Sequence, residues 1–147
     1  MRPAARARQV DPRTALCTDD QAGNLTSATD TPGNLLLGQK PDRQCFTYDG
    51  LRRLTAAWTS KASACGSEPT STLEVDGAAP YWDSYGYDDL GNRRTLTARR
   101  AGSWGSWTGG TTTDGTYSYG QGQAGPHALT GTSTSVNGAA PTAAGYE

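Results

Sequence analysis

The chain has 147 residues, with 13 basic and 14 acidic side chains and a formal net charge of −1. This length suits one domain and is too short for two with separate cores, and the balanced charge provides no field to attract nucleic acid. Leu, Ile, Val and Phe supply only 15 residues, but 4 Trp and 7 Tyr argue against a disordered chain. Gly, Pro, Ser and Thr total 59 residues, which favours turns and Thr-rich strands and excludes a helical bundle.

The N-terminal segment, residues 1–17, is basic and lacks the apolar stretch of a signal peptide. The longest aliphatic run, Leu35-Leu36-Leu37, is much too short to span a bilayer. We therefore expect no signal peptide and no membrane insertion in this chain. Residues 1–17 are expected to be disordered or to be the end of a preceding repeat.

A short motif repeats along residues 18–130. Asp-x-x-Gly-Asn occurs at 20–24 and at 88–92, and a third copy at 49–53 has Arg52-Arg53 in place of Gly-Asn. A fourth, weaker copy follows Tyr119 and lacks the aspartate. Aspartate at the first position and glycine at the fourth favour a type I β-turn. The expected turn residues are Asp20, Gly23, Asn24, Asp49, Asp88, Gly91 and Asn92.

The residues on both sides of each turn have the period of a β-strand. Aromatic residues two apart precede the turn, and after the third-copy turn Leu54, Ala56 and Trp58 alternate with smaller residues. The sequence therefore predicts an all-β fold of about four degenerate antiparallel hairpins, joined by long Gly/Ser/Thr/Pro-rich loops such as residues 109–115. The tail, residues 131–147, is expected to be mobile and to end in the start of a further repeat. The expected aromatic core is Phe46, Tyr48, Trp58, Tyr85, Tyr87, Tyr117 and Tyr119.

Residues 44–59 and 81–98 carry a family resemblance. Cys45-Phe46-Thr47-Tyr48-Asp49-Gly50-Leu51-Arg52-Arg53-Leu54-Thr55 and Tyr85-Gly86-Tyr87-Asp88-Asp89-Leu90-Gly91-Asn92 resemble units of the Rhs family, also called YD repeats. The resemblance implies tandem hairpins that wind into a spiralling sheet, which closes in complete members into a hollow shell. In bacterial members that shell encloses a C-terminal toxin, and the proteins are exported or displayed on the cell surface.

The resemblance implies a structural role without catalysis. The implied partners are neighbouring repeats and a C-terminal cargo domain of the same or parent chain, in an extracellular or cell-surface protein. Four hairpins are too few to close a shell, so the chain is expected to be one piece of it. Self-cleaving members carry an Asp-Pro-x-Gly signature, and residues 11–14 lack its glycine, so self-cleavage is not expected.

Enzymatic and metal-dependent alternatives have little support in the sequence. Any Ser-His-Asp or Cys-His arrangement would have to use His127, which is expected to be structural or exposed. The Asp-x-x-Gly-Asn motif lacks the alternating oxygen ligands of an EF-hand loop, and a single histidine makes a His-based metal site improbable. We expect no enzymatic activity, no metal and no cofactor.

The cysteines and tryptophans leave two alternatives open. Cys45 and Cys65 are twenty residues apart and could form a disulfide in an oxidising compartment, which would leave Cys17 over. The second alternative is a small carbohydrate- or cell-wall-binding β module with exposed Trp and Tyr platforms, although filling of the interior explains the rings more simply. The candidate platforms are Tyr81, Trp82, Tyr85, Trp104, Trp107 and Tyr117.

Overall fold

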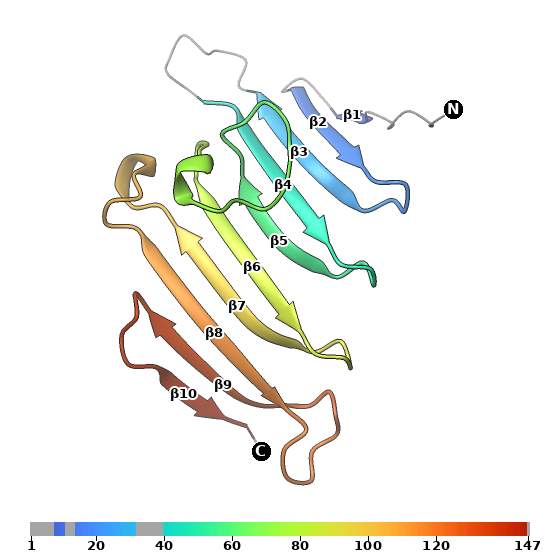
Figure 1. The fold of residues 1–147 in the computed structure, drawn as a ribbon, viewed down its shortest axis with the longest axis vertical. Coiled ribbons are helices and arrows are strands. Elements are labelled where there is room, and N and C mark those ends of the chain that lie inside the picture. The colour runs from blue at the N-terminus through green and yellow to red at the C-terminus, as the bar shows by residue number, and fades with distance from the viewer. Residues whose placement is uncertain (1–7, 11–13, 32–39, 147) are drawn as a thin grey trace. The chain divides into compact units, whose positions relative to one another are not determined.

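The computed structural model describes residues 8–10, 14–31 and 40–146, and this part of the chain is all-β. Figure 1 shows strands that follow one another along the chain and are joined by turns and loops. This arrangement confirms the predicted all-β fold class. The only helical segments among these residues are two short 3-10 turns, η2 (Thr72–Glu74) and η3 (Ser103–Gly105). None of these helices is long and apolar enough to cross a membrane.

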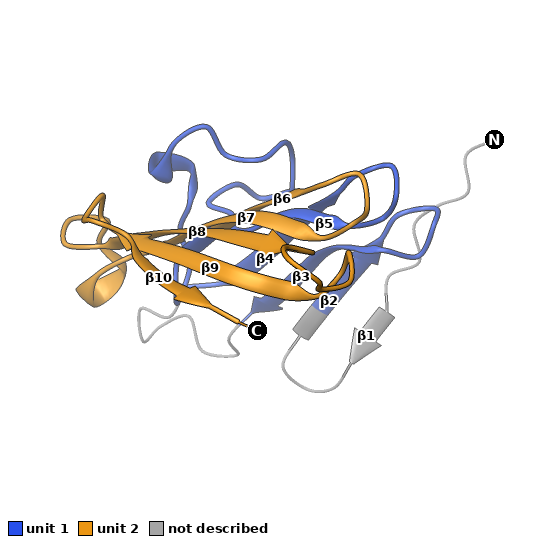
Figure 2. Cartoon of the chain, turned by 90° about the horizontal axis from the view of Figure 1, so that it is seen from below, with its two compact units in different colours: residues 1–82 blue, residues 83–147 orange. Residues whose placement is uncertain are grey.

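The chain divides into two compact units, residues 1–82 and 83–147, coloured separately in Figure 2. This division follows from the hairpin repeat, because each strand contacts mainly its neighbours in sequence.

The first unit contains β1 (Arg8–Val10), β2 (Thr14–Asp19), β3 (Leu25–Thr31), β4 (Asp42–Tyr48) and β5 (Leu54–Thr59). These strands are antiparallel neighbours in chain order. The short turns after β2 and β4 lie at the same end of the strands, whereas the long connection after β5 lies at the opposite end (Figure 1).

The second unit starts within β6 (Tyr81–Tyr87) and continues through β7 (Arg93–Arg100), β8 (Thr111–Tyr119), β9 (Leu129–Val136) and β10 (Thr142–Gly145). Its strands are also antiparallel and follow chain order, with β10 paired to β9. All four residues of β10 are exposed.

Two segments predicted as a mobile tail or a loop contain strands: β9 and β10 fall mostly in the tail 131–147, and β8 begins at Thr111 within a predicted loop. β1 and the start of β2 lie in residues 1–17, which were expected to be disordered or to be the end of a preceding repeat. Runs of small polar residues were interpreted as loops because they lack apolar alternation. Thr and Ser nevertheless have side chains that fit a strand, and pairing with a neighbouring strand satisfies their backbone groups.

The loop after β5 covers one side of the first unit. In Figure 1 this loop, residues 60–80, folds back over β4 and β5, and Ser60 forms an isolated antiparallel bridge with Val75. The indole N–H of Trp82 donates to Glu68 Oε1 at 2.9 Å. The buried hydrophobic residues of the described chain all belong to this unit, and they are Cys45, Ala56, Ala57, Trp58, Val75 and Trp82. The protein therefore has a small core beneath one loop.

Candidate functional site

The aspartate turns have the same geometry in three copies, at residues 20–24, 49–53 and 88–92. The aspartate N–H donates to the carbonyl of the fifth turn residue at 2.9, 3.0 and 3.0 Å, and the fourth residue donates back to the aspartate carbonyl at 3.1, 2.9 and 3.0 Å. The aspartate Oδ1 accepts the N–H of the third residue at 2.8, 2.9 and 3.1 Å. It also accepts the N–H of the fifth residue at 2.9, 2.9 and 2.8 Å. Each carboxylate thus holds its own hairpin closed.

The fifth turn residue also binds the aspartate through its side chain. Asn24 Nδ2 and Asn92 Nδ2 donate to Oδ2 of their aspartates at 2.8 and 3.1 Å. In the third copy of the motif, Arg53 replaces the asparagine and its Nε lies 2.6 Å from Asp49 Oδ2. Arginine preserves this contact because it also presents an N–H donor, so the degenerate motif still forms the same turn.

The turn hydrogen bonds hold the aspartates in the ionised form. The pKa of Asp20 is lowered, mainly by the side-chain hydrogen bond from Asn24, and the pKa of Asp49 is lowered, mainly by the N–H of Arg53. For Asp88, desolvation acts to raise the pKa, but the backbone and side-chain hydrogen bonds from Asn92 outweigh it and the net pKa is lowered. The three carboxylates are acceptors, which is the role that a charged aspartate fills best.

These shifts predict a loss of stability in acid. A carboxyl whose pKa is lower in the folded chain adds stability above its unfolded pKa of about 3.9, and this contribution disappears as pH falls through the folded value. Urea unfolding at pH 7, 5, 4 and 3 should show that most of the decrease in the free energy of unfolding occurs below about pH 4. Asp88→Asn should flatten the acid limb, whereas Asp89→Asn, at an exposed neighbouring position, should leave it unchanged. An acid limb as steep in Asp88→Asn as in the wild type would contradict this role.

The fourth turn residue adopts a left-handed backbone in all three copies. The φ angles are +85° at Gly23, +63° at Arg52 and +87° at Gly91. Glycine accepts this conformation without steric cost, whereas a side chain at a left-handed position costs roughly 1–2 kcal/mol.

Arg52→Gly is therefore expected to stabilise the chain. Glycine loses more chain entropy on folding, so the net gain in the free energy of unfolding should be at most about 1 kcal/mol. Thermal and urea unfolding of the variant measure it. Gly91→Arg is the reverse change in the equivalent turn and should lower the free energy of unfolding. If Gly91→Arg stabilises the chain, or if Arg52→Gly destabilises it, the left-handed backbone does not govern these positions.

A β-bulge follows the turn in three hairpins. The register skips one residue of the return strand in the β2–β3, β4–β5 and β8–β9 pairs, where Asp19 pairs with Leu25, Tyr48 with Leu54 and Tyr119 with Leu129. The skipped residue is a threonine after the leucine in each case: Thr26, Thr55 and Thr130. A bulge adds local twist, so the Leu-Thr pair is part of the structural repeat.

The fourth hairpin keeps the bulge without the aspartate turn. Gly120 N–H donates to the Ala128 carbonyl at 3.0 Å, which closes a longer loop between β8 and β9. His127 in this loop is exposed, and its Nδ1 lies 2.7 Å from Asn92 Oδ1. Asn92 Nδ2 donates to the Pro126 carbonyl at 3.1 Å. His127 thus links two turns of the second unit.

Most of the predicted aromatic core is only half-buried. Trp58 is 2% exposed. The other members of that set have intermediate exposure, and they are Phe46, Tyr48, Tyr85, Tyr87, Tyr117 and Tyr119. Within each unit, the described strands form a single layer, and only the loop after β5 covers part of it (Figure 1), so Trp58 is the one member of the expected aromatic core that is buried.

The half-buried tyrosines make specific contacts. Tyr48 donates its hydroxyl to the Leu25 carbonyl at 2.9 Å, and desolvation raises the pKa of this phenol. In the second unit the Arg93 guanidinium lies 4.5 Å from the ring centroid of Tyr117 and 6.0 Å from that of Tyr85. Such cation–π contacts tie neighbouring strands together. Sequence reasoning missed the Tyr48–Leu25 and Arg93–Tyr117 contacts because the partners in each of these pairs lie in different hairpins.

Two of the three cysteines lie where β4 meets the loop after β5. Cys45 and Cys65 form a disulfide with a Cα–Cα distance of 5.5 Å. Cys17 is a free thiol of intermediate exposure. The bridge anchors the loop to β4, on the face that also carries Trp58, since Cys45 and Trp58 are partners in the β4–β5 register.

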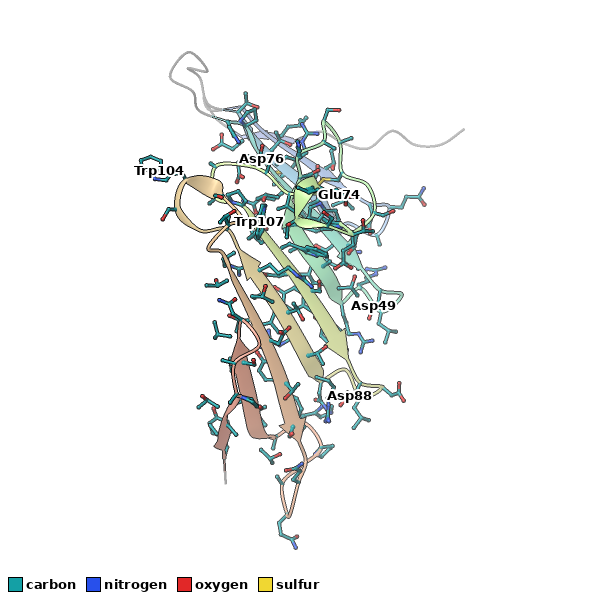
Figure 3. All side chains as sticks on the ribbon, turned by 60° about the vertical axis from the view of Figure 1, so that its left-hand side comes forward. Asp49, Glu74, Asp76, Asp88, Trp104 and Trp107 are labelled. Carbon is teal, nitrogen blue, oxygen red and sulfur yellow. A yellow bond between two sulfur atoms is a disulfide. The ribbon has the colours of Figure 1, made fainter. Side chains whose placement is uncertain are left out.

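The tryptophans differ sharply in exposure. Trp58 and Trp82 are buried, whereas Trp104 is fully exposed and projects from the loop between β7 and β8 in Figure 3. Trp107 in the same loop has intermediate exposure. Of the rings considered as platforms for a sugar, Trp104 alone is completely open to solvent.

The described residues contain no group of three or more His, Cys, Asp or Glu side chains that could hold a metal ion. Asp49 and Asp88, labelled in Figure 3, lie at the tips of separate hairpins. No protein-family model and no curated protein matches the chain. The candidate site is therefore a set of repeated structural turns.

Proposed function

We propose that the chain is a structural, non-enzymatic part of an Rhs-type repeat region, which builds part of a β shell around a C-terminal toxin or effector domain. The observation that carries the proposal is the hairpin itself. Its aspartate turn occurs three times with the same two backbone–backbone hydrogen bonds and the same two bonds from backbone N–H groups to the carboxylate, even where Arg52-Arg53 replace Gly-Asn. A turn retained through such substitutions suits a repeat that must stack on its neighbours.

The strand edges and faces also support a wall-building role. In the second unit β10 pairs with β9, and its residues are exposed. An open edge of this kind is suited to pairing with a further strand. The half-buried tyrosines on the faces are suited to contact with additional chain, because each aromatic ring still has apolar area to bury.

The disulfide supports an exported location. Disulfides persist in oxidising compartments and are rare in the reducing cytosol. The Cys45–Cys65 bridge is thus consistent with a chain that works outside the cell or at its surface.

The test is to sequence the gene on both sides of this reading frame and to express the complete product. The proposal predicts that the frame continues after Glu147 into further Tyr-x-Tyr-Asp-x-x-Gly hairpins and then into a domain of different composition. Limited proteolysis of the complete product should leave that domain protected. A stop codon directly after Glu147, or a terminal domain digested as fast as the same domain alone, would contradict the proposal.

One observation favours a second candidate, a carbohydrate-binding module. Trp104 has 103% relative exposure and a φ of +60°, an unusual backbone conformation for a bulky residue. Titration with cell-wall oligosaccharides, followed by tryptophan fluorescence, tests this function: saturable quenching that Trp104→Ala abolishes supports it, and unchanged fluorescence contradicts it.

A further inference from the structure

A groove runs along one face of the first unit, beside the loop that the disulfide anchors. Its volume is about 690 Å³, which falls within the range of roughly 300–1,000 Å³ typical of ligand sites. Residues 63–66 of the loop line it together with residues of β2, β3 and β4. The Cys45–Cys65 bridge fixes the loop against β4, so this part of the groove is held in place covalently.

The strand register identifies the side chains on this face. Antiparallel partners point to the same side of a sheet, and so do residues two apart in a strand. Thr29 pairs with Arg43, and Ser27 pairs with Cys45 and with Thr18. The bridged Cys45 lies on the loop side, so these side chains lie on that side as well.

Hydroxyl groups dominate this part of the groove. Thr18 Oγ1 lies 2.6 Å from Ser27 Oγ and 3.1 Å from Thr26 Oγ1, so these three hydroxyls form one network. Thr29 and Thr47 add two more hydroxyls to the lining. Each hydroxyl offers one donor and two acceptor positions, so a network of this kind can exchange hydrogen bonds with the hydroxyls of a ligand.

Arg43 places a positive charge near one end of the groove. Its guanidinium has no ion pair or side-chain hydrogen bond with any residue in the described part of the chain, whereas Arg53 and Arg100 pair with Asp49 and Asp83. A half-buried arginine without a carboxylate partner is suited to an anion, since its planar N–H groups match a carboxylate in two-pronged geometry.

The opposite end of the groove has the opposite charge. Asp20 and Asp49 line it there, with their carboxylates hydrogen-bonded to their own turns. Arg43 and Asp49 are six residues apart along β4, which corresponds to about 20 Å. A polyanion with charge along its whole length would meet these carboxylates, so the arrangement favours a ligand whose anionic group lies at the Arg43 end.

We propose that this groove binds an acidic oligosaccharide, with a sugar carboxylate on Arg43 and sugar hydroxyls on the threonine and serine network. A saccharide fits this lining better than an acidic peptide does. The hydroxyl network suits the hydroxyls of a sugar, and the rings of Phe46 and Tyr48, which also line the groove, suit the apolar face of a sugar ring. This site is independent of the shell proposal and of Trp104, which belongs to the other unit.

The test is calorimetric titration of the full chain with a tetrasaccharide of three neutral sugars and one terminal glucuronate, so that the ligand carries a single carboxylate at one end. We expect one saturable site with a Kd on the order of 1 mM or lower. The neutral control is maltotetraose, which has the same number of rings without carboxylates and should bind at least tenfold more weakly. Tetraglutamate, an acidic peptide, should also bind at least tenfold more weakly.

Variants separate this site from the alternatives. Arg43→Gln should weaken binding of the glucuronate tetrasaccharide at least tenfold without a change in melting temperature. Arg94→Gln removes the same charge from an exposed position in the second unit and should have no effect, and neither should Trp104→Ala. The proposal is overturned if no titrant binds, if Arg43→Gln binds as well as the wild type, or if Arg94→Gln weakens binding equally. Equal affinity for maltotetraose or tetraglutamate would also overturn it.

Discussion

Replacing Cys45 and Cys65 together with alanine is expected to lower the free energy of unfolding by about 3 kcal/mol. The bridge closes a loop across a sequence separation of 20 residues, and its loss restores the chain entropy of that loop in the unfolded state. Alanine is the appropriate replacement because Cys45 is fully buried, and a serine hydroxyl would add a desolvation cost at that position. Urea unfolding of the double variant measures the loss.

The control for this prediction is Cys17→Ala. Cys17 is a free thiol, so its replacement removes no bridge and should change the free energy of unfolding by less than about 1 kcal/mol. The wild type in reducing buffer should behave as the double variant does. If the double variant and the oxidised wild type unfold at the same urea concentration, the bridge contributes no stability.

Trp58→Ala is expected to destabilise the chain by about 3–5 kcal/mol. Trp58 is 2% exposed and is the more deeply buried of the two tryptophans in the core beneath the loop after β5. In a core this small, few other side chains can move to fill the cavity left by the indole. Thermal and urea unfolding, followed by the far-ultraviolet circular dichroism of the strands, test this prediction.

The same substitution at Trp104 provides the matched control. Trp104 is fully exposed, so Trp104→Ala removes almost no buried surface and should change stability by less than about 0.5 kcal/mol. If Trp58→Ala costs no more than Trp104→Ala, the small core does not stabilise the first unit. If Trp58→Ala fails to fold, Trp58→Phe should give a folded chain of intermediate stability.

The hairpin repeat could be predicted because its signals are local. Aromatic residues two apart, aspartate at the start of the turn and glycine at its fourth position all act within about ten residues. The all-β class follows from these signals. The recurring bulge was also open to prediction, since a Leu-Thr pair begins the return strand in each of the three hairpins where it occurs.

Non-local features could not be predicted in the same way. The half-exposure of Tyr85 and Tyr117 depends on whether another layer covers the sheet, and a sequence motif does not encode that. The position of Arg93 beside the Tyr117 ring depends on pairing between β7 and β8, which belong to different hairpins. The groove at Arg43 depends on where the disulfide holds a distant loop.

Strands built from small polar residues were missed for another reason. Residues 111–113 are three threonines, and β9 has the sequence LTGTSTSV, so neither shows the alternation of apolar and polar residues that identifies a half-buried strand. Pairing supplies the missing stabilisation, because β8 has partners on both sides, in β7 and β9. The tertiary neighbours therefore decide the structure of such segments.

Electron cryomicroscopy of the product of the complete reading frame tests the central claim most directly. The proposal predicts that residues 14–146 form consecutive hairpins in a continuous β wall, with the aspartate turns along one rim and density for a terminal domain enclosed by that wall. A product in which these residues stand free, with neither further hairpins at the edge of β10 nor an enclosed domain, would contradict it.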